Sequence, residues 1–229
     1  MISNKYAVIV AGGTGSRLGG GLPKQFRDLN GKPLVWWSIK AFRDADRDVK
    51  IILVVHPDFV QVWKKLFASL PLEDQIPHEV KCGGSSRTES VINGIFEIPS
   101  SDDVLIAVHD AARPLVTVSL INRGWECGDK YGACVPVIPV TDSLRKICGN
   151  DNEAIDRKDY VAVQTPQVFK ASILKSAYQK KAGVIFTDDA SATEAAGWKT
   201  ALFEGSPDNM KVTNPGDIEI ATLRLNSRE

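Results

Sequence analysis

The chain is poor in the residues that mark several common kinds of site. Its 229 residues include four cysteines and three histidines, and the cysteines form no Cys-x-x-Cys pair. A zinc centre or a disulfide framework is therefore not expected, and we expect buried free thiols. The 28 basic residues balance the 28 acidic ones, and no basic block stands out. This balance argues against an extended nucleic-acid surface.

Long apolar segments are also missing. The first five residues contain no long apolar stretch of the kind found in secretion signals. No apolar run approaches the roughly 18 residues that cross a bilayer. Internal repeats, low-complexity tracts and domain linkers are absent as well. We therefore expect one cytoplasmic domain over residues 1–229, with no nucleic-acid or membrane partner.

What the chain does contain is a regular alternation of two patterns. Short apolar runs predict strands at residues 7–10, 50–55, 79–82, 104–108, 133–137, 161–164 and 200–203. Segments with helical spacing lie between them, at 34–42, 58–70, 88–98, 118–131, 171–181, 188–196 and 216–225. This order predicts an α/β fold of the Rossmann-like, three-layer α/β/α kind, with a mostly parallel twisted sheet. Ligands of such sheets bind at the carboxyl ends of the strands.

Residues 140–160 interrupt this alternation. Alternating residues flank a turn at 149–152, which predicts a β-hairpin. A hairpin is only marginally stable in water by itself. We therefore expect residues 138–160 to form an arm that packs on a second subunit of a homodimer, with a mobile surface flap as the alternative.

A glycine-rich loop follows the first predicted strand. Gly12, Gly13 and Gly15 let bare backbone approach a ligand and point N–H groups at phosphate oxygens. Arg17 and Lys24 add positive charge, so the loop suits a nucleoside triphosphate. An ordinary strand-to-helix turn is the alternative.

Two better-known glycine loops do not fit this segment. The dinucleotide fingerprint needs a third glycine where this chain has Leu18, and the acidic residue expected about 20 positions later is missing. The P-loop needs a glycine before its lysine and a Ser or Thr after it, whereas Lys24 lies between proline and glutamine. Both a nicotinamide dehydrogenase and a P-loop enzyme are thereby disfavoured.

Asp110 follows the apolar run 104–108 and would lie at the same edge of the sheet, as would Gly84. A carboxylate there, opposite a phosphate loop, is well placed to hold Mg²⁺, although it could instead cap the next segment. Arg113 could pair with Asp110 and orient it, or make a surface contact. We expect His109 to be a packed residue rather than a base.

Three further segments carry weaker signals. Thr165-Pro166-Gln167 is a turn that returns the chain to the same edge. The segment from Thr187 has the pattern of a helix N-cap, and a contact with substrate is the alternative. Lys211 lies in a short extended stretch and could equally be a solvated surface residue.

Together these segments resemble one family along nearly the whole chain, the 2-C-methyl-D-erythritol 4-phosphate cytidylyltransferases. The resemblance rests on Ala11-Gly12-Gly13-Thr14-Gly15-Ser16-Arg17, Pro23-Lys24-Gln25, His109-Asp110-Ala111-Ala112-Arg113-Pro114, Thr165-Pro166-Gln167, Thr187-Asp188-Asp189-Ala190-Ser191 and Asn209-Met210-Lys211-Val212-Thr213. The glycine loop is common to many nucleotidylyltransferases. The histidine-aspartate segment, taken with the Lys211 segment, is far more specific.

The resemblance implies roles for residues in this numbering. It implies catalytic groups at Arg17, Lys24, Lys211 and Asp110, with Asp110 near the magnesium ion. It implies nucleotide contacts at Ala11, Gly12, Gly13, Gly15, Gly84, Ser85, Ser90 and Ala111. Substrate contacts are implied at Thr141, Arg157, Thr187 and Arg113, the first two reaching the neighbouring subunit. Where many members have Gly-Gly-Asp, this chain has Ser85, so a side-chain contact near the base is in doubt.

The activity implied by the resemblance is transfer of CMP from CTP to methylerythritol phosphate, with Mg²⁺ and with release of pyrophosphate. A cytidylyltransferase for ribitol 5-phosphate or another polyol phosphate would share most of these motifs. A non-catalytic nucleotide sensor on the same scaffold would not need the full set of cations.

Overall fold

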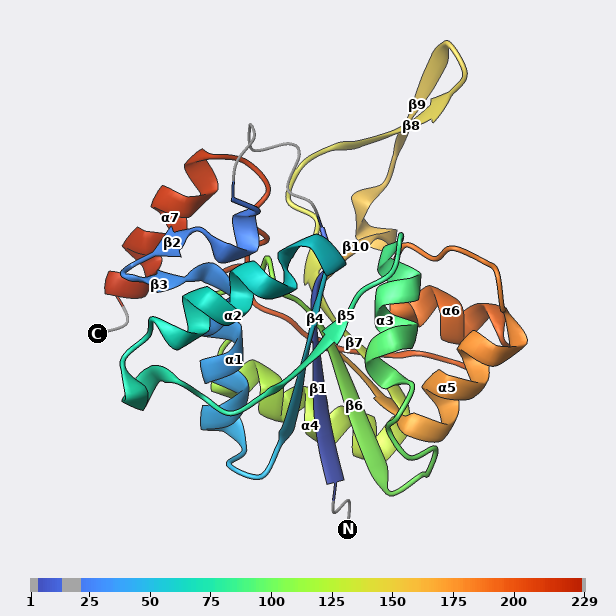
Figure 1. Ribbon diagram of the computed structural model, residues 1–229. Coiled ribbons are helices and arrows are strands. Elements are labelled where there is room, and N and C mark those ends of the chain that lie inside the picture. Colours follow the sequence, from blue (N-terminus) through green and yellow to red (C-terminus); the bar gives the residue numbers. More distant parts are fainter. Residues whose placement is uncertain (1–3, 14–21, 228–229) are drawn as a thin grey trace.

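An eight-stranded sheet forms the centre of the molecule (Figure 1). In this computed structural model, described for residues 4–13 and 22–227, the strand order is β10-β7-β11-β6-β1-β4-β5, with β12 also beside β7. The strands are β1 (Asn4–Ala11), β4 (Lys50–Val55), β5 (Glu79–Cys82), β6 (Val104–Asp110), β7 (Ala133–Pro139), β10 (Val161–Val163), β11 (Gln167–Lys170) and β12 (Ala201–Glu204). Within this sheet β10 and β11 run against the other strands, so the expectation of a mostly parallel sheet is confirmed.

Helices cover both faces of the sheet. One face carries α1 (Leu34–Ala45), α2 (Val60–Ala68) and α4 (Val118–Tyr131), and the other carries α3 (Arg87–Ile95), α5 (Ala171–Lys180) and α6 (Asp189–Ala195). The alternation of side chains along β1 explains the two cores, because Ala7 and Ile9 face the first set of helices while Val8 faces the second. All three side chains are fully buried, as in a strand covered on both faces. The three-layer α/β/α prediction is confirmed.

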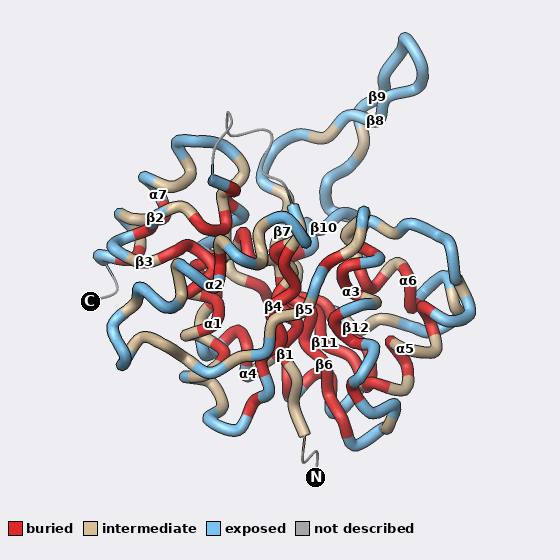
Figure 2. The backbone as a smooth tube through the Cα atoms, viewed as in Figure 1, coloured by how far each residue is buried: buried red, intermediate tan, exposed pale blue. Residues whose placement is uncertain are grey.

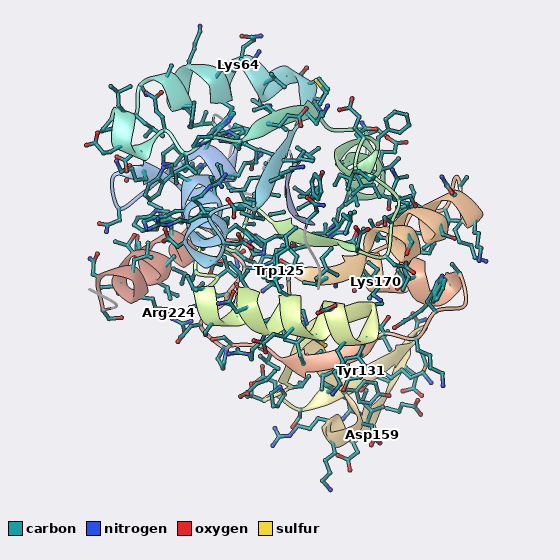
Figure 3. All side chains as sticks on the ribbon, turned by 90° about the horizontal axis from the view of Figure 1, so that it is seen from below. Lys64, Trp125, Tyr131, Asp159, Lys170 and Arg224 are labelled. Carbon is teal, nitrogen blue, oxygen red and sulfur yellow. The ribbon has the colours of Figure 1, made fainter. Side chains whose placement is uncertain are left out.

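Helix α4 has one side chain in the core at Trp125 and one in solvent at Tyr131. Trp125 is buried in the core beneath the sheet, whereas Tyr131 at the end of the helix is exposed (Figure 3). The Thr117 side chain caps the start of α4 by accepting a hydrogen bond from the Leu120 N–H. Gly132, at φ +82°, ends the helix in the left-handed region.

A small third core supports the C-terminal segment. It joins α7 (Gly216–Asn226) to the short hairpin of β2 (Asp28–Leu29) and β3 (Lys32–Pro33). Val212 is fully buried in this core beside Leu115. Its backbone N–H also donates to the carbonyl of Ala112, which fixes the segment next to the end of β6. Lys211 is thereby held at the sheet edge.

The predicted hairpin is present and projects from the body. Strands β8 (Leu144–Cys148) and β9 (Asp151–Ile155) pair antiparallel around Gly149, which has φ +65°. Almost every residue of the pair is exposed, and Figure 2 shows the hairpin standing clear of the buried centre. No core of its own holds it in place within the described part of this chain.

Two expectations need correction. Strand β11 was not predicted: residues 167–170 pair antiparallel with β6 and β7, but their only apolar residues, Val168 and Phe169, are adjacent, show no alternation and lie directly before α5. Only Cys127 and Cys134 are buried, whereas Cys82 and Cys148, on β5 and the hairpin, are exposed.

None of the helices in the described ranges has the length and apolar composition needed to cross a bilayer.

Candidate active site

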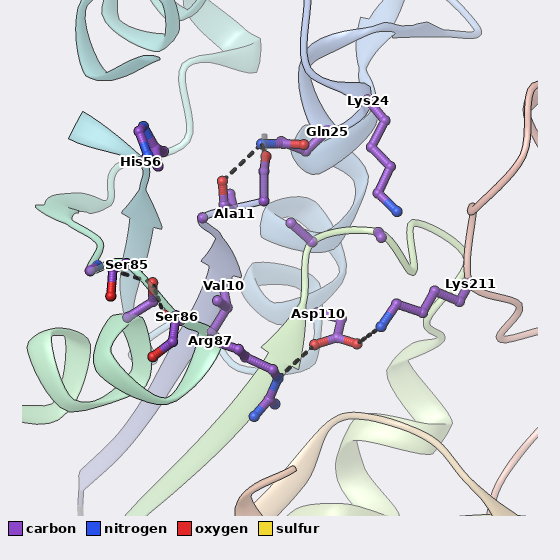
Figure 4. A pocket seen from close by; sticks show the side chains of 16 residues that line it. Val10, Ala11, Lys24, Gln25, His56, Ser85, Ser86, Arg87, Asp110 and Lys211 are labelled. Carbon is purple, nitrogen blue, oxygen red and sulfur yellow. Dashed lines mark hydrogen bonds and ion pairs between the residues drawn. The ribbon is translucent and has the colours of Figure 1, made fainter. Parts of the chain in front are cut away.

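A cavity of about 440 Å³ opens at the carboxyl ends of the central strands (Figure 4). It is bounded by the end of β1, the loop after β5 and the loop after β6. The predicted site residues that it brings together are Ala11, Gly12, Gly13, Lys24, Gly84, Ser85, Ser90, Asp110, Ala111 and Lys211. Gly15 and Arg17 lie outside the described residues. Most of the predicted nucleotide and catalytic residues that the structure describes therefore lie around one cavity, and their roles stay predictions.

One end of the cavity is made of backbone and small neutral side chains. A Cβ atom on Gly84 would lie 2.3 Å from the Cβ of Glu89, and one on Gly12 would lie 2.8 Å from Ser90 Oγ. These positions accept only glycine without movement. Ser90 Oγ accepts from the Gly84 N–H at 3.1 Å and donates to the Ser86 carbonyl at 2.9 Å. These two bonds fix the loop after β5 to the first turn of α3, and Gly12 lies close against Ser90.

Gln25 secures the start of the glycine loop. Its side-chain amide donates to the carbonyls of Ala11 and Gly13, both at 2.8 Å, and the residue is buried. Gln25 belongs to η2 (Lys24–Phe26), so this one short helical turn supplies both the loop support and a cation. Gln25 lies in the Pro23-Lys24-Gln25 motif, from which no role for it was predicted. A polar residue buried beside a glycine loop was the available signal.

The other end of the cavity is charged, with Asp110 between two cations. Lys211 Nζ lies 2.7 Å from one carboxylate oxygen, and Arg87 Nε lies 3.4 Å from the other. Burial alone would raise the pKa of Asp110, but the charges of Arg87 and Lys211 outweigh it, and the pKa lies well below its ordinary range. Asp110 is therefore ionised at neutral pH. Its backbone N–H donates to Thr165 Oγ1 at 3.0 Å, which confirms that the Thr165 turn returns to this edge.

Lys24 and Lys211 arrive at this end from distant parts of the chain. Lys24 Nζ donates to the carbonyl of Val212 at 2.8 Å, beside Lys211. Figure 4 shows both lysines at one end of the cavity and His56 with Ser85 at the other. The cavity is therefore polarised, with a positive end and a neutral end. Such a division suits a ligand with a charged tail and an uncharged ring.

A second cavity, of about 390 Å³, adjoins the first. It contains Arg113 and Thr187, and it shares Arg87, Asp110 and Lys211 with the first cavity. Arg113 donates to the carbonyl of Asn209 at 2.7 Å, and no ion pair with Asp110 is found among the described contacts. The prediction that Arg113 pairs with Asp110 and orients it is therefore wrong. Arg87 and Lys211 form the ion pairs with Asp110 instead.

His109 is packed, as predicted. It is fully buried between the carbonyl of Arg113 and Thr165 Oγ1, each 3.1 Å from one ring nitrogen. Burial lowers the pKa of His109 to about 4, so the ring is neutral at pH 7. Its contacts connect the loop after β6 to the Thr165 turn.

Thr141 and Arg157 are not part of either cavity in this chain. Both residues are exposed at the base of the hairpin, where Arg157 donates a hydrogen bond to the carbonyl of Thr141. Neither residue borders the two described cavities. Their predicted contact with substrate would need a second subunit and stays a prediction.

Arg87 is the main charged residue that sequence reasoning missed. It begins α3 directly after the Gly83–Ser86 loop and borders both cavities. A cation at the first position of a helix that follows a glycine loop was the available signal. His56, at the end of β4, was also given no role, although it borders the neutral end.

Comparisons with known proteins agree with this geometry. The family model described as 2-C-methyl-D-erythritol 4-phosphate cytidylyltransferase matches residues 6–227. Proteins of that name from Bacteroides thetaiotaomicron and Porphyromonas gingivalis are 39% and 40% identical, covering 95% and 99% of this chain and 98% and 100% of their own. The Thermus thermophilus enzyme structure has a TM-score of 0.75 at 31% identity, over 96% of this chain and 98% of that one. The Francisella tularensis structure has a TM-score of 0.78 at 28% identity, over 97% and 100%.

Proposed function

The chain belongs to the 2-C-methyl-D-erythritol 4-phosphate cytidylyltransferase family, and from this premise we propose how its two cavities carry out the reaction. The first cavity binds CTP and the second binds 2-C-methyl-D-erythritol 4-phosphate. Transfer of CMP gives 4-diphosphocytidyl-2-C-methyl-D-erythritol and pyrophosphate. We place the reaction in the cytoplasm, because both substrates are polyanions that do not cross a bilayer unaided.

The observation that carries this assignment is the shared wall of the two cavities. Arg87, Asp110 and Lys211 border both, so a donor in one and an acceptor in the other meet at these three charged groups. A protein that only sensed a nucleotide would not need a second polar cavity at the phosphate end. Lys24 supplies further positive charge to the triphosphate, and we expect the same of Arg17, which lies outside the described residues.

The neutral end favours a base with an amino group. Ser85 Oγ donates to Glu89 Oε2 at 2.7 Å, and Ser90 Oγ donates to the Ser86 carbonyl. With its hydrogen engaged, the Ser85 hydroxyl presents only acceptor lone pairs to a ligand, whereas the buried Ser90 Oγ also accepts from the Gly84 N–H. The amino group of cytosine suits such acceptors better than the carbonyl of uracil. Ser85 with Glu89 thus supports recognition of CTP although the family's usual aspartate is missing.

The chemistry is an in-line substitution at phosphorus. A phosphate oxygen of the acceptor forms a bond to the α-phosphorus, the bond from that phosphorus to the bridging oxygen breaks, and pyrophosphate leaves with the electron pair. The acceptor phosphate is already anionic at pH 7, so no general base is required. Catalysis then depends on holding two polyanions together and stabilising the charge that develops. Lys24 and Lys211 are placed to do both.

Asp110 fits the predicted magnesium ion as its one protein carboxylate. No group of three or more His, Cys, Asp or Glu side chains gathers in the ranges the structure describes. Magnesium is commonly held by one or two carboxylates together with phosphate oxygens, and Asp110 is ionised and borders the charged end. When bound, the ion would neutralise charge on the triphosphate.

We also propose that the hairpin acts across a homodimer. At its base, Tyr160, Val161 and Val163 are 46%, 45% and 42% exposed, and β10 is an edge strand. An exposed apolar sheet edge is suited to pairing with another chain. In a mixed dimer of Arg157→Ala and Lys24→Ala chains, one site would contain both native residues. Partial recovery of activity on mixing the two impaired variants is expected, whereas no recovery would mean that the arm serves its own subunit.

The decisive experiment is a pyrophosphate-release assay. Each of the four nucleoside triphosphates is combined with methylerythritol phosphate and, separately, with ribitol 5-phosphate. We expect release with CTP and methylerythritol phosphate at a rate well above every other pair. A faster reaction with ribitol 5-phosphate would reassign the acceptor, and no release with any pair would leave a nucleotide-binding protein without this activity.

A further inference from the structure

Arg87 lies at the junction of the two cavities and contacts two carboxylates. Its Nη2 atom is 2.6 Å from Asp189 Oδ2, and its Nε atom is 3.4 Å from Asp110 Oδ1. The shorter contact is therefore with Asp189, which belongs to the first turn of α6 and is fully buried. Asp110, by contrast, borders both cavities, and its side chain is more exposed than that of Asp189. The position of the Arg87 guanidinium is thus set mainly by Asp189, a buried residue that borders neither cavity.

Asp189 is held in turn by a second buried residue. The hydroxyl of Tyr178, on α5, donates to Asp189 Oδ1 at 2.6 Å, and Tyr178 is 5% exposed. A buried carboxylate is costly unless such partners satisfy it. The backbone N–H groups of Asp189 and Ala190 also donate to Gln167 Oε1, each at 3.0 Å. The start of α6 is therefore fixed to strand β11, and the carboxylate has little freedom to follow Arg87.

One N–H donor group of Arg87 has no acceptor among the described residues. Its Nη1 atom is buried and has no hydrogen-bond partner among the described residues. An unpaired buried donor on a charged group is destabilising, and native structures rarely keep one without a role. Arg87 borders both cavities, and a ligand oxygen that reached its guanidinium would satisfy this donor. The phosphoryl oxygens of the donor and the acceptor have the required charge.

We propose that Asp189 and Tyr178 are positioning residues, which hold Arg87 at the junction so that its free N–H meets a phosphoryl oxygen during transfer. This inference rests on the proposed function. Without Asp189, the guanidinium would turn toward Asp110, the only other carboxylate that it contacts in the described structure. Such a turn would remove the donor from the reacting phosphate and tighten the contact with Asp110 Oδ1, which Arg87 Nε already approaches at 3.4 Å.

The test compares Tyr178→Phe and Asp189→Asn with two matched controls. Tyr131→Phe changes an exposed tyrosine on α4, and Asp44→Asn changes an exposed aspartate on α1. We expect kcat to fall about 3- to 10-fold for Tyr178→Phe and about 30-fold or more for Asp189→Asn. The KM for CTP should change less than about threefold, because the base is bound at the far end of the cavity. Both controls should retain the wild-type kcat.

Arg87→Lys tests the requirement for the guanidinium itself. A lysine keeps the positive charge but cannot contact both carboxylates with separate nitrogens, so we expect kcat to fall at least as far as in Asp189→Asn. A purely structural role would lower the melting temperature of Tyr178→Phe and leave its kcat unchanged below that temperature, which would overturn the inference. The Tyr178→Phe result decides the matter even if Asp189→Asn does not fold. Failure of the proposed function is distinct, since wild-type protein would then release no pyrophosphate.

Discussion

Removal of the Lys211 ammonium is the most direct test of the charged end of the site. Lys211 is 43% exposed and pairs with Asp110 at 2.7 Å. Because solvent screens a pair of this exposure, Lys211→Ala should cost about 1 kcal/mol or less in the free energy of unfolding. Asp110 would keep Arg87 as a partner and remain ionised. The variant should therefore fold and bind CTP.

Turnover should respond far more strongly than stability. Lys211 borders both cavities, where negative charge builds up as the acceptor phosphate meets the α-phosphorus. By analogy with the loss of one oxyanion-hole donor, the barrier should rise by about 3–4 kcal/mol, a decrease in kcat of about 100- to 1000-fold. Lys211→Arg should recover part of this loss, because it restores the charge with a different shape.

The assay is steady-state pyrophosphate release with CTP and methylerythritol phosphate, combined with thermal unfolding of each variant. Lys199→Ala is the matched control, since Lys199 is exposed and borders neither cavity. A Lys211→Ala enzyme with kcat within about threefold of wild type would refute a role for this cation in the transition state. A large loss of stability would instead show that the pair with Asp110 supports the fold.

Three further predictions follow from particular contacts. Arg157→Ala should raise the KM for the acceptor more than the KM for CTP; an equal rise would argue against the arm contact. Gly84→Ala places a Cβ 2.3 Å from Glu89 and should raise the KM for CTP about tenfold or more, unlike Gly216→Ala, which has open space. Burial lowers the pKa of His109 from 6.5 to about 4, so the unfolded state binds more protons between these values. The free energy of unfolding should fall by about 3 kcal/mol as the pH drops through this window, and His109→Gln should lack that decrease in denaturant titrations.

The sequence predicted the layers of the fold and gathered at one sheet edge most of the residues that border the first cavity. Continuous apolar runs such as 50–55 occur where a strand is buried on both faces, so their order along the chain gives the sheet and its covering helices. The carboxyl ends of parallel strands share one edge, which is why Gly84 and Asp110 could be placed together in advance. The antiparallel strand β11 could not be found in this way, because Val168 and Phe169 form neither an alternation nor a run longer than two residues, and α5 follows directly.

The partners of Asp110 required the tertiary structure. Closeness along the chain suggested Arg113, yet the ion pairs come from Arg87 and Lys211, 23 and 101 residues away. A pattern of apolar residues reports which face of an element is buried, but it carries no information about which distant polar side chains meet.

By itself, then, the sequence determined the order of strands and helices, the glycine loop and the position of Asp110 at a strand end, because these depend on local periodicity and on the direction of parallel strands. Only the folded chain decided that Arg87 lies between Asp110 and Asp189, since that contact brings together β6, α3 and α6. Long-range packing fixes such contacts through the summed burial of whole elements, and no short segment encodes it.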